Sequence, residues 1–213
     1  MPGWRDPTRK RVDVTESAFH PVQMLTQYYT ATSIDGYIAD PDNSLEWLFQ
    51  LGQDESMKDE YPTFIADVGA IAMGSTTYQW ILDHTNLLDD PSTWEYDMAA
   101  WVFSSRDLPA VKGADIRFVS GDVAPVHAEM VAAAQGKNVW LVGGGDLVGQ
   151  FHDQGLLDEL ILGVASVTLG SGAPLLPRRI TTPPLRLREV RQYGESFVTL
   201  RYTVPRAESG SPA

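Results

Sequence analysis

The sequence predicts an α/β domain built on an open, largely parallel sheet. Short apolar runs alternate along the chain with segments of helical pattern, which is typical of strands connected by helices. Two of the apolar runs lead directly into glycines that open a helix, as parallel strands do at the carboxyl edge of such sheets. The last two apolar runs meet at Tyr193-Gly194-Glu195, which favours an antiparallel hairpin.

Eight segments are predicted as strands, because each is a short apolar or alternating run bounded by polar or turn residues. They are Met24–Ala31, Val68–Met73, Ala99–Ser104, Ile116–Val119, Asn138–Val142, Glu159–Val164, Leu185–Tyr193 and Ser196–Val204. Helices are predicted over Asp54–Asp67, Thr76–Leu82, Pro125–Gln135 and Leu147–Gln154. No internal repeat or linker divides the chain, so we expect one domain over residues 23–205, with a flexible arm (1–22) before it and a disordered tail (206–213) after it.

Composition excludes several classes of function. A net charge of −12 argues against a nucleic-acid partner, because phosphate backbones are bound by basic surfaces. No run of 18 apolar residues is present, so we expect no membrane span, and no apolar segment of a secretory signal follows the first basic residues. The chain has no cysteine, which fits a cytoplasmic protein and excludes thiolate chemistry. The four histidines lack metal-ligand spacing, so we predict no metal site.

The strongest local signal is the triple glycine Gly143-Gly144-Gly145, which stands between an apolar strand and a helix. Glycine lets the backbone approach a ligand, and the start of a helix offers free N–H groups to an anion. A tight turn alone would account for one or two glycines, so three in a row favour a phosphate site.

A second corner has the same composition. The apolar run that ends at Met73 leads into Gly74, and a helical segment follows from Ser75 and Thr76. These hydroxyls can simply cap the helix. Two glycine-led corners in one open sheet, however, suit a dinucleotide whose pyrophosphate lies between two helix N-termini.

A third segment ends the run before it in Ser104-Ser105-Arg106. Two hydroxyls and a guanidinium at a strand end are suited to a terminal phosphate. The alternative is that Arg106 is a solvated loop residue.

Four motifs in this order carry a resemblance to a known superfamily. They are Thr30 to Ala39 (TATSIDGYIA), Met73 to Tyr78 (MGSTTY), Phe103 to Arg106 (FSSR) and Val142 to Gly145 (VGGG). The chain resembles the dihydrofolate reductase superfamily over about residues 24–204, and is most similar to the reductase domain of the bifunctional riboflavin-biosynthesis deaminase-reductase. The resemblance implies an eight-stranded, mostly parallel sheet flanked by helices, an antiparallel C-terminal hairpin, and NADPH as the cofactor.

The resemblance also implies which residues bind that cofactor. The nicotinamide would lie against Thr30 and Ala31, under a loop that carries Gly36 and Ile38. The pyrophosphate would be held from one side by Gly74, Ser75, Thr76 and Thr77, and from the other by Val142, Gly143, Gly144, Gly145, Asp146 and Leu147. The 2′-phosphate of the adenosine would contact Ser104, Ser105 and Arg106.

The chain departs from its relatives at three positions. Dihydrofolate reductases commonly carry an arginine where this chain has Ser75, so a preference for NADPH over NADH depends on Arg106. Riboflavin reductases often carry a lysine where this chain has Tyr37. The register of the segment from Pro41 to Phe49 puts Ser44 near the position of the carboxylate that binds folate.

Catalytic and substrate-binding candidates follow from their position near the nicotinamide strand. Asp35 is the candidate proton donor, with a pKa raised by burial, and its alternative is an ordinary Asp-Gly turn. Ser33 and Trp47 are the candidate substrate contacts, and Trp47 could stack on a heteroaromatic ring or belong to the core.

We therefore expect an NAD(P)H-dependent reductase that transfers a hydride to a small heterocyclic or carbonyl compound, with the aminouracil reductase step of riboflavin biosynthesis as one candidate. Dihydrofolate reductase activity and a nucleotide-binding protein without turnover are the alternatives, and a single phosphate site would also suit a flavin mononucleotide. We expect a homodimer, because the C-terminal strands carry unusually many apolar and aromatic side chains. These are Val190, Tyr193, Phe197, Val198, Leu200 and Tyr202.

Overall fold

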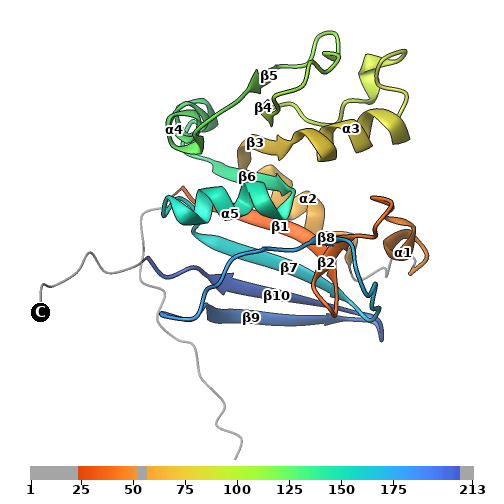
Figure 1. Cartoon of the computed structure of the whole chain (residues 1–213), viewed down its shortest axis with the longest axis vertical. Coiled ribbons are helices and arrows are strands. Elements are labelled where there is room, and N and C mark those ends of the chain that lie inside the picture. Colours follow the sequence, from red (N-terminus) through yellow and green to blue (C-terminus); the bar gives the residue numbers. More distant parts are fainter. Residues whose placement is uncertain (1–23, 52–56, 207–213) are drawn as a thin grey trace, which may run out of the picture.

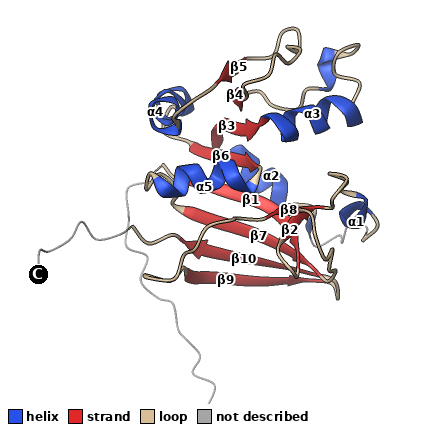
Figure 2. Cartoon of the chain, viewed as in Figure 1, coloured by secondary structure: helices blue, strands red, loops and turns tan. Residues whose placement is uncertain are grey.

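A computed structural model describes residues 24–51 and 57–206 and contains an eight-stranded sheet with helices on both faces (Figures 1 and 2). The strands are β1 (Thr26–Ser33), β3 (Val68–Gly74), β4 (Ala99–Phe103), β5 (Ile116–Val119), β6 (Asn138–Gly143), β7 (Glu159–Ala165), β9 (Arg186–Tyr193) and β10 (Phe197–Thr203). Their order across the sheet is β5-β4-β3-β6-β1-β7-β10-β9. Each of the eight predicted strands is present within a few residues of its expected bounds.

The sheet is parallel from β5 to β7, and β10 pairs antiparallel with both β7 and β9. The predicted mostly parallel sheet with an antiparallel C-terminal hairpin is therefore confirmed. Because β1 lies between β6 and β7, its neighbours are more than a hundred residues away in sequence.

The helices cover the two faces of the sheet. They are α1 (Glu46–Phe49), α2 (Glu60–Ala66), α3 (Ser75–His84), α4 (Val123–Ala134) and α5 (Gly145–Asp153). One core cluster packs α4 and α5 against one face, through side chains such as Met130, Phe151, Tyr28 and Leu141. The other packs α2 and α3 against the opposite face, around Tyr78, Ile71 and Trp140. Successive residues of one strand thus enter different cores, because side chains along a strand point to opposite faces in turn.

Four short elements were not predicted, because segments of two to four residues carry no measurable periodicity. Strands β2 (Tyr37–Ala39) and β8 (Ala173–Pro174) form a second, two-stranded antiparallel sheet. Helix α1 has a single turn, and a 3-10 helix (η2) spans Pro91–Thr93. Helix α2 begins only at Glu60, and the predicted start of this helix at Asp54 falls outside the described residues.

The predicted arm lies outside the described residues, as does the predicted tail beyond Arg206. Arg206 itself is described, and its guanidinium donates to Asp158 at 3.0 Å. No helix in the described part of the chain is long and apolar enough to cross a membrane. Residues 24–51 and 57–206 also contain no group of three or more side chains that could hold a metal ion.

Candidate functional site

The register of the sheet brings the three predicted cofactor segments together at its carboxyl edge. Met73 of β3 is opposite Gly143 of β6, and Gly74 of β3 is opposite Phe103 of β4. The two glycine corners and the Ser104-Ser105-Arg106 segment therefore leave the sheet side by side, from three adjacent strands.

The two glycine corners start helices whose N-termini are free. Gly74 is the N-cap of α3 and Gly144 is the N-cap of α5, and no described side chain bonds to either N-terminus. By contrast, the carboxylate of Asp122 accepts the backbone N–H of Ala124 at the start of α4. A Cβ atom on Gly74 would lie 3.8 Å from both the Gly143 oxygen and the Gly144 nitrogen, so the corners touch. Free N–H groups of two converging helices favour a bound anion.

The three glycines of the α5 corner have different roles. Gly143 has a φ of +150°, which side chains rarely adopt, whereas Gly144 has a φ of −81° and open space around it. A side chain on Gly145 would collide with the carbonyl oxygens of Pro174 and Leu175. Gly145 is therefore required by the chain's own loop, and open space for a ligand lies at Gly144.

Side chains of the remaining cofactor candidates are partly committed to the fold. Asp146 pairs with Arg178 at 3.1 Å, and Leu147 is a core residue with 7% exposure, so Leu147 can offer a ligand only its backbone N–H group. Ser104 Oγ accepts the backbone N–H of Arg106 at 2.9 Å, which closes a small turn and leaves the Arg106 side chain exposed.

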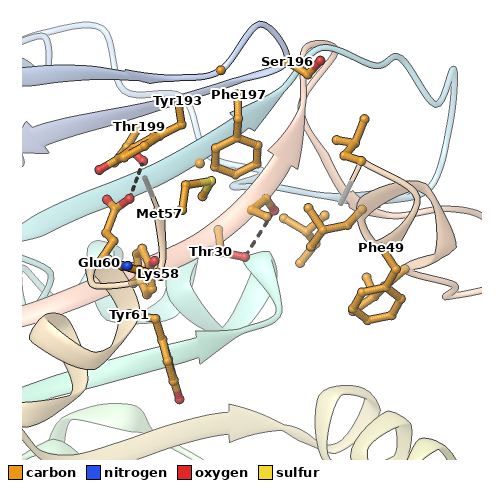
Figure 3. A pocket seen from close by; sticks show the side chains of 18 of the residues that line it. Thr30, Phe49, Met57, Lys58, Glu60, Tyr61, Tyr193, Ser196, Phe197 and Thr199 are labelled. Carbon is orange, nitrogen blue, oxygen red and sulfur yellow. Dashed lines mark hydrogen bonds between the residues drawn. The ribbon is translucent and has the colours of Figure 1, made fainter. Parts of the chain in front are cut away.

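A cavity of about 860 Å³ opens beside these corners (Figure 3). Thr30, Ala31 and Ile38, which the sequence assigned to the nicotinamide region, line it together with Val142, which the sequence assigned to the pyrophosphate. Val142 directly precedes the Gly143 corner, so the cavity adjoins the edge of the sheet that carries the two glycine corners. These residues lie together in the structure, whereas Gly36, which was assigned to the nicotinamide with them, does not line the cavity.

A third of the remaining described lining residues are aromatic, and this aromatic wall was not predicted. Tyr29, Phe49, Tyr61, Trp140, Tyr193 and Phe197 line the cavity. The Phe197 ring lies over Gly163, where a Cβ atom would be 2.5 Å from the ring. Phe197 and Tyr193 were expected on a dimer surface, but here they face the cavity from the C-terminal hairpin (Figure 3). A strand's alternation shows which residues share a face, but not which face the cavity occupies.

A polar group also enters the cavity from the first turn of α2. The hydroxyl of Thr199 donates to Glu60 Oε2 at 3.4 Å, and the Tyr193 phenol lies near enough to interact with the same carboxylate. Burial, followed by this interaction with Glu60, raises the pKa of Tyr193. Burial and the nearby charge of Glu60 likewise raise the pKa of Tyr29, so both phenols stay protonated at neutral pH. Nothing in the local sequence around Glu60 marks it as a site residue.

Asp35 does not fit the role of proton donor. Its carboxylate accepts the Ser33 hydroxyl at 2.6 Å and the backbone N–H groups of Leu169 and Gly170 at 3.1 and 2.7 Å. These bonds lower the pKa of Asp35, and the bond from Ser33 contributes most. The sequence had instead led us to expect a pKa raised by burial. Asp35 precedes Gly36, whose φ is +84°, so the alternative turn role is the correct one.

Ser33 and Trp47 also have structural roles and do not line the cavity. Ser33 is 1% exposed, and its hydroxyl accepts the backbone N–H of Tyr37 at 3.0 Å while it donates to Asp35. Trp47 is 7% exposed and belongs to the core, because α1 turns this side chain inward and exposes its neighbour Phe49 instead.

Comparison with known proteins agrees with this geometry. The family model described as the RibD C-terminal domain matches residues 77–199. The uncharacterized protein YwjB of Bacillus subtilis (strain 168) is 31% identical over 179 residues, which cover 83% of this chain and 96% of that protein.

Solved structures share the fold. A putative riboflavin biosynthesis protein from Shewanella sp. PV-4 has a TM-score of 0.69 at 24% identity, covering 84% of this chain and 98% of that one. Dihydrofolate reductase from Enterococcus faecalis, complexed with NADP(H) and RAB-propyl, has a TM-score of 0.53 at 11% identity, covering 84% and 95%. The resemblance to this superfamily, stated from four motifs, is confirmed.

Proposed function

The chain belongs to the family of the RibD C-terminal domain, a reductase-like family with the dihydrofolate reductase fold, and from this premise we propose that it is an NADPH-dependent reductase of a small heterocyclic or carbonyl compound. Thr30, Ala31 and the two glycine corners, with Arg106, are the residues that would hold the cofactor. A bound reduced nicotinamide would supply the hydride that this chemistry needs.

One observation supports this proposal more than any other. The free N-termini of α3 and α5 converge at Gly74 and Gly144, and the cavity lined by Thr30 and Val142 begins at the same edge of the sheet. An extended dinucleotide needs this arrangement, because it requires an anion site for its central pyrophosphate and a pocket beside that site for the nicotinamide. The acidic net charge makes such local N–H donors necessary, because the protein as a whole repels anions.

The protein's own contribution would be to position the substrate and to exclude water. The aromatic wall gives the cavity a large apolar surface, and the protonated hydroxyls of Tyr29 and Tyr193 can donate hydrogen bonds there. Holding two reactants in contact can account for a large share of a catalysed rate, so a single strong acid at the reacting atom is not required.

Titration of the purified protein with NADPH and NADH tests the cofactor, and oxidation of the bound cofactor against dihydrofolate, ribosylaminopyrimidines and a carbonyl panel tests the reaction. We expect NADPH to bind more tightly than NADH and one compound class to be reduced. If NADPH does not bind, or if flavin survives dialysis, the cofactor assignment is refuted. Tight binding without oxidation across the panel would favour a nucleotide-binding protein without turnover.

A further inference from the structure

The charged side chains around the cavity are few and mostly negative. Among the described lining residues they are Lys58, Glu60 and Glu195, and none is an arginine. A phosphorylated substrate is usually held by arginine forks or by a cluster of cations. The described wall offers one lysine against two carboxylates, so it disfavours a phosphate inside the cavity.

Glu60 is held in this wall by neutral donors. Thr199, 6% exposed, donates to its carboxylate at 3.4 Å (Figure 3), and the phenol of Tyr193 on the neighbouring strand interacts with the same carboxylate. Within residues 24–51 and 57–206, no ion pair to Glu60 is found within 4.0 Å. A partly buried carboxylate held by hydroxyl groups retains its attraction for a cation, because protein surroundings screen that charge less than water does.

The aromatic wall is complementary to the same kind of ligand. The rings of Tyr29 and Tyr61 lie 6.4 Å apart, within 17° of parallel, and Trp140 packs against both. The ring of Phe197 faces the same cavity as Thr199, the residue that donates to Glu60 (Figure 3). Aromatic faces attract cations and stack on planar rings, and the attraction grows when water is excluded.

A cationic acceptor also removes the need for an acid in the cavity. Asp35, the expected proton donor, is used in a turn outside it. Reduction of a C=N⁺ bond adds a hydride with its two electrons to carbon, and the π electrons become a lone pair on nitrogen. The charge of the substrate is neutralised in that step, so no proton has to come from the protein.

We propose that the cavity takes a planar cation without a phosphate, of the class of protonated or N-alkylated imines, with Glu60 as its counter-ion. This inference rests on the proposed reductase function and names the substrate class of the same cavity.

Three probes that share one ring test the charge preference: benzamidine (a planar C=N⁺ cation that resists reduction), benzamide (neutral) and phenyl phosphate (anion). Isothermal titration of the full-length protein, with and without saturating NADPH, gives their dissociation constants. We expect benzamidine to bind more tightly than benzamide, and phenyl phosphate to bind most weakly. The reverse order in the wild-type protein would overturn the proposal.

Substitution of Glu60 locates the effect. Glu60→Gln keeps the shape and removes the charge, and it should weaken benzamidine on the order of tenfold, the loss expected for one charge-assisted contact, with benzamide unchanged. Glu129→Gln removes the same charge from the exposed surface of α4, on the other face of the sheet, and should leave all three probes unchanged. Equal benzamidine affinity in wild type and Glu60→Gln would refute the role of Glu60.

NADPH titration of the same samples separates the two proposals. NADPH should bind wild type and Glu60→Gln equally, because Glu60 lies in the substrate wall. If NADPH binds and benzamidine shows no preference, only the substrate class is wrong. If NADPH does not bind at all, the reductase proposal fails, whatever the probes show.

Discussion

Two adjacent glycines of the α5 corner should respond in opposite ways to the same substitution. Gly145→Ala adds a Cβ atom 2.7 Å from the Leu175 carbonyl carbon, and nearer still to the carbonyl oxygens of Pro174 and Leu175. These are backbone atoms, so the loop that carries β8 must move away from α5. Gly144→Ala adds the same atom where nothing lies within 4 Å, at a φ of −81° that alanine adopts readily.

The magnitudes follow from those contacts. Overpacking of this kind costs about 1–3 kcal/mol. For a domain of this size each kcal/mol lowers Tm by about 2–4 °C, so Gly145→Ala should melt roughly 2–12 °C below wild type. Gly144→Ala should keep its Tm or gain about 0.4–1 kcal/mol, because alanine reduces the freedom of the unfolded chain. Its NADPH affinity should fall at least about tenfold, since the new methyl group occupies the proposed anion site.

Thermal melting of the unliganded proteins and fluorescence titration with NADPH measure the two effects separately. Each variant is the control for the other, because they differ only in which glycine carries the methyl group. A Gly145→Ala protein that melts with wild type would show that the β8 loop yields freely. Wild-type NADPH affinity in Gly144→Ala would remove this corner from the cofactor site.

Three further outcomes are expected. Arg106→Ala should weaken NADPH by about ten- to a hundredfold and leave NADH unchanged, because one exposed cation would contact the 2′-phosphate; equal losses for both would contradict this role. Asp35→Asn should lower Tm at pH 7 but not near pH 2, because a folded-state pKa below the ordinary 3.8 gives stability that is lost as the pH falls through it. The pH profile of any reductase activity should be the same in Asp35→Asn and wild type. We also propose that the protein is a dimer through β9, where Leu187 and Val190 are each 55% exposed. Val190→Glu should therefore give a monomeric mass by light scattering. A monomeric wild type at micromolar concentration would refute the dimer.

The sequence by itself determined the eight strands of the main sheet and the position of the two glycine corners. Strand positions follow from runs of apolar residues, and the corners at Gly74 and Gly143 follow from glycines placed where a strand becomes a helix. Both signals are local, since they depend on neighbours within a few residues. Parallel strands then bring their carboxyl ends to one edge, so the proximity of the corners could be expected before any contact was known.

Only the tertiary structure decided what the remaining residues do. Asp35 is fixed by the backbone of Leu169, 134 positions away, and Glu60 is held by Thr199, 139 positions away. No local pattern records such partners, because the pairing of β1, β7 and β10 and the placement of α2 create them. The same long-range packing assigned Trp47 to the core and gave the cavity its aromatic wall. A side chain's chemistry depends on its neighbours in space, and here those neighbours come from opposite ends of the chain.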